Sequence, residues 1–323
     1  MVHALLFPTV VHMKIYFDGV DFEAEHTGPN CFAKRLAVAL GNLGHVAADP
    51  DDYDVALVFI EPTSRLDPRK PFVQRLDGIW FKPEQMAAGM NRGIHAAYDA
   101  ATHVVWQSEF DKKMSVKWFG DRPGSIIPNG IELEPATLRS ETLIEMRKRY
   151  DKIFVCSSNW HPQKRFHDNF TYYRALREKH YPNSCLIVMG NNPPQGAGYQ
   201  GRDVFYTGSI RHDLCMEVYS VADWMIHLAW LDHCPNVVVE AISQGCPVIC
   251  SSEGGTAELV LNKNGLVLYD QEPYKFDLVD YDNPPRIHAP PMTLPSNRAD
   301  PASVDIVKCA KAYEDALKLA VAK

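Results

Sequence analysis

The strongest constraint on the fold is the alternation of short apolar runs with helix-like segments along the whole chain. The runs are rich in β-branched residues and almost continuously apolar, which is typical of strands buried on both faces of a parallel sheet. They are KIYF, DVALVFI, GIWF, HVVWQ and SIIP in the first half, then IFVCS, CLIVM, VFYTG, WMIHLAW, PVICS and LVLY. Parallel neighbours need right-handed crossover helices, so the sequence predicts doubly wound α/β domains.

The length of 323 residues favours two such domains. A break is expected after PNGI (128–131), because a charged, helix-capable stretch without a strand follows it. The segment 271–300 is rich in Pro, Asp and Tyr and predicts loop. Pro301 stands at a plausible start of a last helix. The predicted organisation is an N-terminal extension (1–12), a Rossmann-like domain (13–131), a linker and helix (132–150), a second Rossmann-like domain (151–300) and a C-terminal helix crossing back to the first domain (301–323).

Charge and hydropathy bear on the partners. Lys and Arg number 33 against 40 Asp and Glu, giving a net charge of −7. A nucleic-acid partner is therefore not expected, since such proteins usually present a basic face. No apolar run approaches the length that spans a bilayer, and we expect peripheral membrane contact at most.

The cysteines indicate a reducing compartment. None of the eight forms a C-x-x-C pair, and most lie in apolar runs. This pattern predicts reduced, packed thiols in a cytoplasmic protein and offers no zinc site. The N-terminal stretch MVHALLFPTVV lacks a basic start and contains Pro8, which favours an extension over a signal peptide.

A candidate site follows the strand WMIHLAW. The loop LDHCPN would lie at the carboxyl edge of the sheet, where open parallel sheets bind ligands. Pro235 fits the first turn of the next helix. The amides around Cys234, Asn236 and Val237 would then point outward with the positive end of the helix dipole, which attracts phosphate or a sugar oxygen.

Glu240 is expected about one turn into that helix. A carboxylate only accepts hydrogen bonds and can bind two vicinal hydroxyls, as on a ribose. A helix cap or a surface ion pair is the alternative, although the flanks VVV and AI favour a partly enclosed side chain.

Two further turns repeat this arrangement. In SEGGTAELV, Gly254 and Gly255 would let backbone approach a ligand, and Thr256 could cap a short helix. An ordinary glycine turn is the alternative. In WHPQKRF, Lys164 and Arg165 stand at a helix start, where basic side chains need an anionic partner such as a diphosphate. A solvated basic turn is equally compatible with this segment alone.

Taken together, the stretches DHCPNVVVE, AISQGCPVI and SSEGGTAELV closely resemble the C-terminal signature of retaining glycosyltransferases of family 4, which have the GT-B fold. PNGI, QSEF (107–110), TGPN (27–30) and WHPQKRF are similar to other features of this family. The resemblance extends from about Lys14 to Leu268. It implies two Rossmann-like domains facing a cleft, with the acceptor on the first and the nucleotide-sugar on the second.

The resemblance also implies residue roles. Glu240 matches the acid that holds the ribose, and Asp232 matches an acid beside the transferred sugar, usually Glu in the family. Lys164 matches the lysine that binds the donor diphosphate. The family often has Arg where this chain has Asn159, and Arg165 is a candidate for the missing charge.

Two other positions concern the first domain. Gly28 matches the glycine-rich loop that approaches the donor phosphates or the acceptor. Many members have a His after a strand of this domain, whereas Lys82 follows GIWF here, so that role stays unassigned.

The implied function is sugar transfer from a nucleoside-diphosphate sugar (UDP or GDP) to a hydroxyl of a glycan, lipid or small molecule, with retention. No metal or other cofactor is expected, because cations and helix dipoles would stabilise the leaving diphosphate. Two alternatives stay open: a GT-B nucleotide-sugar epimerase and a non-catalytic nucleotide-sugar-binding protein.

Overall fold

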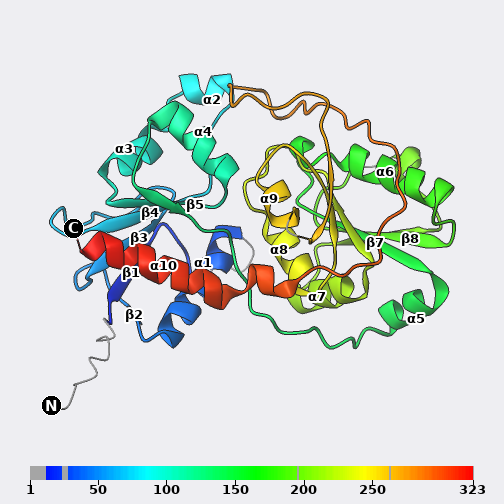
Figure 1. Cartoon of the computed structure of the whole chain (residues 1–323), viewed down its shortest axis with the longest axis horizontal. Helices are drawn as coiled ribbons and strands as arrows, with labels where there is room; N and C mark the ends of the chain where they lie inside the picture. The colour runs from blue at the N-terminus through cyan, green and yellow to red at the C-terminus, as the bar shows by residue number, and fades with distance from the viewer. Residues whose placement is uncertain (1–11, 24–27, 195, 262, 323) are drawn as a thin grey trace, which may run out of the picture.

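Two parallel sheets divide the protein into two domains that lie side by side (Figure 1). The computed structural model describes residues 12–23, 28–194, 196–261 and 263–322, so most of the predicted N-terminal extension lies outside the described residues. Each sheet has six strands, in the orders β2-β1-β3-β4-β5-β6 and β12-β11-β10-β7-β8-β9. Their described pairings are parallel. The predicted pair of doubly wound α/β domains is confirmed.

The described part of the first domain contains six strands and four helices. The strands are β1 (Lys14–Asp18), β2 (Val46–Ala47), β3 (Val55–Phe59), β4 (Phe72–Leu76), β5 (His103–Trp106) and β6 (Gly124–Ile126). The helices are α1 (Gly28–Asn42), α2 (Pro83–Ala87), α3 (Arg92–Ala100) and α4 (Glu109–Phe119).

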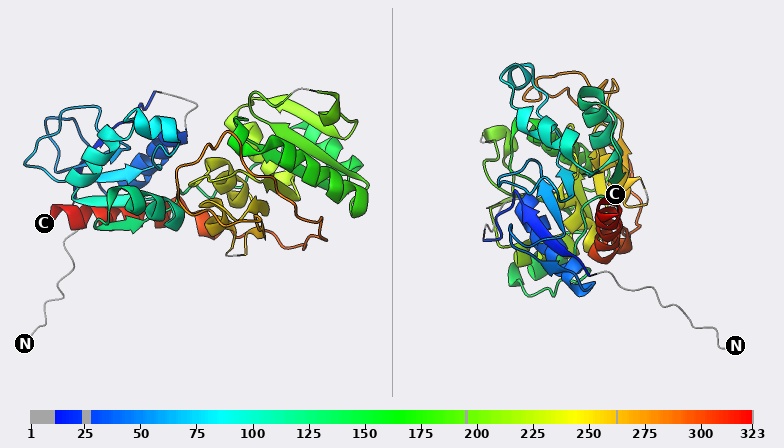
Figure 2. Two further views of the ribbon diagram at one scale, coloured as in Figure 1. Left: turned by 90° about the horizontal axis from the view of Figure 1, so that it is seen from above. Right: turned by 90° about the vertical axis from the view of Figure 1, so that its left-hand side faces the viewer.

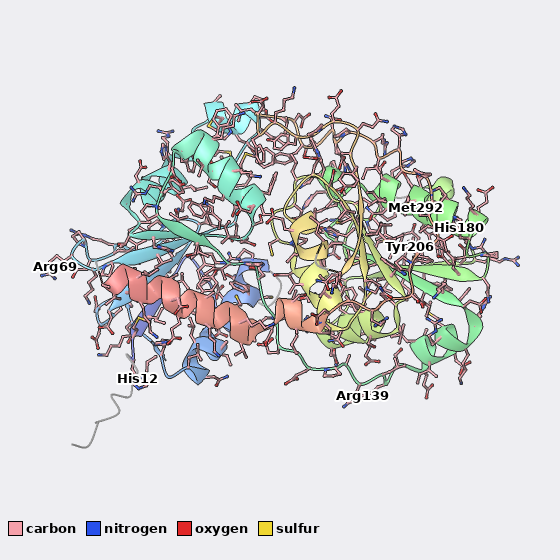
Figure 3. All side chains as sticks on the ribbon, viewed as in Figure 1. His12, Arg69, Arg139, His180, Tyr206 and Met292 are labelled. Carbon is pink, nitrogen blue, oxygen red and sulfur yellow. The ribbon has the colours of Figure 1, made fainter. Side chains whose placement is uncertain are left out.

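The second domain follows the helix α5 (Glu141–Arg149). Its strands are β7 (Lys152–Ser157), β8 (Ser184–Met189), β9 (Val204–Gly208), β10 (Trp224–His227), β11 (Val248–Ser251) and β12 (Gly265–Leu268). Its helices are α6 (Phe166–Lys179), α7 (His212–Val221), α8 (Asn236–Ser243) and α9 (Thr256–Val260), with short 3-10 turns at Pro162–Lys164 and Ala197–Tyr199. Figure 3 shows side chains packed between sheets and helices in both domains, with Arg69 and His180 near opposite outer ends.

Continuous apolar runs mark the most buried strands. Every residue of β3 and of β8 is buried. Helices cover both faces of each sheet, so no strand face needs polar residues for solvent. The sequence pattern therefore located these strands correctly.

The strand predicted at GIWF is wrong, and the actual strand is β4, whose sequence is FVQRL. Two polar residues interrupt its apolar pattern, yet both are buried and partnered. Gln74 Nε2 donates to the carbonyls of Ile60 (2.6 Å) and Ile94 (3.1 Å). The Arg75 guanidinium pairs with Asp77. Internal hydrogen bonds and charge pairing let these side chains replace apolar ones in the core.

The C-terminal helix crosses back to the first domain, as predicted. After a 3-10 turn at Pro301–Val304, α10 (Ile306–Val321) packs against α1 and the first sheet (Figure 1). Asp305 caps it by accepting from the Val307 amide. Gly130 lies under the helix start, where an added Cβ would come within 2.8 Å of the Ile306 Cα.

The segment 271–300 has no regular structure, as expected, but part of it joins the two domains. We call residues 274–282 the strap; it lies in the orange chain at the top of Figure 1 and bridges the domains in Figure 2. Lys117 Nζ of α4 pairs with Asp277 (2.5 Å), and Trp118 Nε1 donates to the Phe276 carbonyl (3.1 Å). The Val279 amide donates to the Phe81 carbonyl (3.0 Å). The strap thus covers α4 with aromatic and charged contacts.

Packing of α10 gives a stability test with an internal control. Leu317 is fully buried in the first domain's core, whereas Leu319 of the same helix is 53% exposed. We expect Leu317→Ala to cost about 2–5 kcal/mol, because it removes buried surface and leaves a cavity. Leu319→Ala should stay within about 0.5 kcal/mol of the parent. Urea unfolding measures both; equal losses would contradict the docking of α10.

Candidate active site

The carboxyl ends of central strands from both sheets meet at a cleft between the domains. The strand order reverses between β1 and β3 in the first sheet and between β7 and β10 in the second, and open α/β sheets bind ligands at such switch points. A cavity of about 480 Å³ lies there. Its lining residues are Pro29, Cys31, Arg75, Asp77, Gln107, Asn129, Ser158, Asn159, Lys164, His227, Asp232, His233, Cys234, Pro235, Asn236, Val237 and Glu240.

Asp232 forms the centre of a charged cluster on the second domain's side. Its Oδ2 lies 2.5 Å from Lys164 Nζ and 3.3 Å from His227 Nε2. Burial alone raises the pKa of Asp232, but Lys164 and His227 outweigh it, and the net pKa lies well below the ordinary value. Burial lowers the pKa of His227, Lys164 lowers it further, and Asp232 offsets only part of this shift. The structure thus brings together the predicted Asp232 and Lys164, with an ionised carboxylate next to an ammonium.

The SEGG turn holds the loop that carries Asp232. The Leu231 amide donates to the Glu253 carbonyl (3.1 Å), and the Gly255 amide donates to the Asp232 carbonyl (2.7 Å). A Cβ on Gly254, whose φ is +124°, would come within 2.8 Å of the Asp232 carbonyl oxygen, and one on Gly255 within 1.9 Å of the His233 oxygen. These glycines therefore lie behind the loop against protein backbone and do not line the cleft.

The residues predicted at the two helix starts differ in whether they line the cleft. Thr256 begins α9 and is buried away from the cleft, and no side-chain cap bond is formed at that helix start. Cys234, Asn236 and Val237 do line the cleft at the start of α8, with Pro235 as the residue preceding the helix. Of the two predicted helix starts, the start of α8 thus lines the cleft and the start of α9 does not.

Glu240 is enclosed, 9% exposed, and paired across the domain boundary. Its Oε1 accepts from Arg35 Nη2 of α1 (3.0 Å) and lies 3.3 Å from His212 Nε2 of α7. Burial alone raises the pKa of Glu240, but His212 and Arg35 outweigh it, and the net pKa is lowered. Glu240 is therefore ionised, and one of its oxygens is held by a residue of the other domain.

Asn129 of the PNGI motif links the domains at the floor of the cleft. Its Oδ1 accepts from Arg75 Nη2 (2.8 Å). Its Nδ2 donates to the Cys234 carbonyl (3.2 Å) and to Asn236 Oδ1 (2.9 Å). The asparagine thus fixes the start of α8 relative to the first domain.

The first domain contributes a polar group that sequence reasoning missed. Arg75 is 1% exposed and stacks over the rings of Phe32 (4.6 Å) and Phe59 (5.0 Å) while it pairs with Asp77. Gln107 Nε2 also donates to Asp77 Oδ1 (2.5 Å). Burial raises the pKa of Asp77, and Arg75 reduces that shift. The signal was present in QRLDG, where Arg75 interrupts an apolar strand and Asp77 directly follows it.

His233 extends from the second domain into the first. Its Nδ1 lies 3.5 Å from Asp111 Oδ1 of α4, and its ring lies 5.3 Å from the Phe110 ring. Gly78 makes room for it, because a Cβ there would come within 2.3 Å of His233 Nε2. Burial lowers the pKa of His233, but Asp111 outweighs it and the net pKa is raised.

Arg165 does not face the cleft, which corrects the expectation that it supplies the charge missing at Asn159. It adopts a left-handed conformation (φ 50°) and is 2% exposed. Its Nη2 donates to Asp270 Oδ1 (2.7 Å), and its guanidinium lies 5.8 Å from the Trp230 ring. The backbone turn after Lys164 directs this side chain into the second domain.

The structure also shows where Lys82 and Gly28 lie relative to the cleft. Lys82 lies away from the cleft, where it pairs with Asp280 (3.7 Å) and Asp282 of the strap. Gly28 begins α1, directly before the cleft residue Pro29, whereas Thr27 of the TGPN motif lies outside the described residues.

Three structural facts bear on other ligands. No group of three His, Cys, Asp or Glu that could hold a metal ion occurs within the described ranges. Among the helices of that same part of the chain, none combines the length and apolarity needed to cross a membrane. The eight cysteines are free thiols, and six of them are buried.

Comparison with known sequences finds a family similarity within the second domain. Residues 151–277 match the family described as glycosyl transferases group 1, and this segment includes Lys164, Asp232 and Glu240. Among curated protein sequences, none matches the chain significantly. The match covers less than half of the chain and shows that the second domain is similar to the glycosyltransferases of this group.

Solved structures agree on the fold. HepE from Anabaena in complex with UDP-glucose has a TM-score of 0.64 at 16% identity, covering 95% of this chain and all of that one. Sucrose-phosphate synthase from Thermosynechococcus elongatus has a TM-score of 0.62 at 16% identity, covering 96% and 97%. AviGT4, a glycosyltransferase involved in avilamycin A biosynthesis, has a TM-score of 0.61 at 16% identity, covering 96% and 98%. At this identity the likeness shows the fold, which is GT-B.

The titration of His227 tests the charge cluster. Asp232→Asn removes the carboxylate that raises the pKa of His227, so that pKa should fall further. Lys164→Met removes an ammonium that lowers it, so the pKa should rise. Proton–carbon NMR of the imidazole over a pH series measures both changes. Shifts of the same sign in both variants would contradict the cluster.

Proposed function

We propose that the protein transfers a sugar from a nucleoside-diphosphate sugar to an acceptor hydroxyl, with retention at the anomeric carbon. The observation that carries this proposal is the arrangement of Lys164, Asp232, the start of α8 and Glu240 along one cavity. An ammonium and a helix N-terminus offer positive charge to a diphosphate. A carboxylate eight residues after Asp232 offers acceptors to ribose hydroxyls.

The donor's path follows from two neighbouring cavities. A cavity of about 1000 Å³ lies between residues 131–140 of the linker and residues 209–217, which include the start of α7. His212 lines this cavity and lies 3.3 Å from Glu240, which lines the cleft. In the proposal, the base occupies this larger cavity, the ribose lies at Glu240, and the diphosphate and sugar extend toward Lys164 and Asp232. Arg139, labelled in Figure 3, lies on the linker beside this path.

Charge separation is the barrier that these residues would lower. The bond between the anomeric carbon and the diphosphate oxygen breaks as the acceptor oxygen bonds to the same carbon. Lys164 and the α8 amides stabilise the negative charge on the departing diphosphate, which is electrostatic preorganisation. The acceptor's proton passes to that diphosphate. Because these groups supply the positive charge, the proposal includes no metal or other cofactor.

Asp232 has a different role in this scheme. It is ionised beside the sugar position, where it orients sugar hydroxyls and steadies positive charge on the ring. The double-displacement scheme requires two carboxyls flanking the bond, and Glu240 is assigned to the ribose, so Asp232 is not a covalent nucleophile.

The first domain's face of the cleft suits a hydroxyl-bearing acceptor. Asp77 and Gln107 line it and can exchange hydrogen bonds with hydroxyls, which favours a carbohydrate acceptor over a lipid. UDP-sugars are the first donors to test, because HepE is described with UDP-glucose and with UDP.

A donor screen tests the proposal directly. Thermal shift with UDP-, GDP-, ADP- and TDP-sugars should identify a stabilising donor, since a ligand that binds only the native state raises Tm. Incubation of that donor with a panel of sugars should yield a product with retained anomeric configuration. Donor binding without any product would favour a non-catalytic binding protein. An epimerised donor formed without acceptor would favour an epimerase.

Two substitutions separate donor binding from chemistry. Glu240→Ala should weaken donor and UDP binding about 10–100-fold, because hydrogen bonds to a charged group contribute about 1.5–3 kcal/mol. Asp232→Ala should retain UDP binding but lower turnover on the order of 10²-fold. Calorimetry and a transfer assay measure these effects, with the exposed Glu178→Ala of α6 as a silent control. Unchanged UDP affinity in the Glu240 variant would remove the ribose assignment.

A further inference from the structure

We propose that Arg35 is a positioning residue that makes recognition of the nucleotide's ribose depend on closure of the two domains. It acts through Glu240 and not by touching the nucleotide itself. The inference rests on the proposed function, because it concerns the same nucleotide, but it assigns a role to a residue of the opposite domain.

The contact joins elements that are far apart in the chain. Arg35 lies on α1 of the first domain, whereas Glu240 lies on α8 of the second. Arg35 Nη2 lies 3.0 Å from Glu240 Oε1 and 3.1 Å from His212 Nε2. The Arg35 and Glu240 side chains are 13% and 12% exposed, so solvent screens this pair only weakly.

The geometry leaves half of the carboxylate available. The contacts from Arg35 and His212 both end on Oε1 of Glu240. A carboxylate has about four acceptor positions on two oxygens, so Oε2 can still accept from ribose hydroxyls. Arg35 therefore fixes the orientation of the carboxylate without occupying the position assigned to the ligand.

Arg35 supplies the positive charge that balances the Glu240 carboxylate when the two domains are in contact. An enclosed carboxylate is costly without a partner, and a guanidinium is always protonated. His212 comes from the same domain as Glu240 and carries charge only when it is protonated. The permanent countercharge of Glu240 therefore comes from the other domain and is lost when the domains separate.

Coupling follows from this arrangement. If closure orders Glu240 for the ribose, then nucleotide binding must favour closure by the same factor, because coupling between two equilibria is reciprocal. Among the described residues that line the cleft, Arg75 is the one arginine, and it is paired with Asp77 and not with Glu240.

A double-mutant cycle tests the role. The Kd for UDP is measured by calorimetry for wild type, Arg35→Ala, Glu240→Gln and the double variant. We expect Arg35→Ala to weaken UDP binding about 10-fold, which corresponds to about 1.4 kcal/mol. Because Arg35 acts through Glu240, adding Arg35→Ala to Glu240→Gln should change Kd by less than about 2-fold. Arg35→Lys, which keeps the charge, should recover part of the loss.

Small-angle scattering measures whether UDP makes the protein more compact, which would not change if Arg35 only stabilised the fold. UDP should compact the wild-type protein and fail to compact Arg35→Ala. Arg69→Ala is the matched control, since it removes an exposed arginine of the same domain that lies outside the cleft. It should retain UDP-induced compaction. Circular dichroism verifies that each variant is folded.

Three results would overturn the proposal. They are a wild-type UDP affinity in Arg35→Ala, additive effects of Arg35→Ala and Glu240→Gln on the Kd, or UDP-induced compaction of Arg35→Ala equal to that of the wild type. Additivity would point to direct contact between Arg35 and the nucleotide. Failure of the proposed function is distinct, because wild type itself would then bind none of the nucleotide-sugars or their diphosphates.

Discussion

The ion pair between Lys164 and Asp232 is the interaction on which the account of this protein depends. The two side chains lie 2.5 Å apart at the edge of the second sheet, where the segments after β7 and β10 converge. In water such a pair would contribute little, but the cleft is partly enclosed and charges act more strongly there. The pair lowers the pKa of Asp232 and so keeps this carboxylate ionised at the position proposed for the donor's bond to its diphosphate. It also fits the group 1 family match, whose residues 151–277 contain both partners.

The position of this pair is fixed by contacts from both domains. Asn129 joins Arg75 to the start of α8, and His233 inserts beside Gly78 and Asp111. At the rim, both carboxylate oxygens of Glu258 accept from the first amides of α4, at Glu109 (2.7 Å) and Phe110 (2.8 Å). This places a carboxylate at a helix N-terminus, where the helix dipole stabilises it. Together with α10 and the strap, these contacts determine how the two faces of the cleft meet.

The fold could be predicted from the sequence because the spacing of apolar residues follows directly from which strand faces are buried. Strands such as β3 and β8, buried on both faces, appear as continuous apolar runs. β4 was missed because Gln74 and Arg75 are buried with internal partners, and their polarity is compensated only by residues distant in sequence. The strap was predicted as loop, correctly, but its contacts with α4 depend on tertiary packing that local composition does not encode.

The candidate site was predicted in part for the same reason. Lys164, Asp232 and Glu240 follow strands or begin helices at one edge, so topology alone brings them into one cavity. Arg165 is adjacent to Lys164 in sequence, but a left-handed turn directs it away, and the sequence carries no clear sign of that turn. Arg35, Asp77 and Asn129 come from the other domain, and their roles depend on how the domains meet.

The most direct test of the central claim is a crystal structure of the protein with UDP-glucose or another donor that stabilises it. The account predicts that the diphosphate lies within hydrogen-bond distance of Lys164 Nζ and of the amides at the start of α8, with the ribose on Glu240. A diphosphate bound elsewhere, away from Lys164 and from the turn before α8, would contradict it.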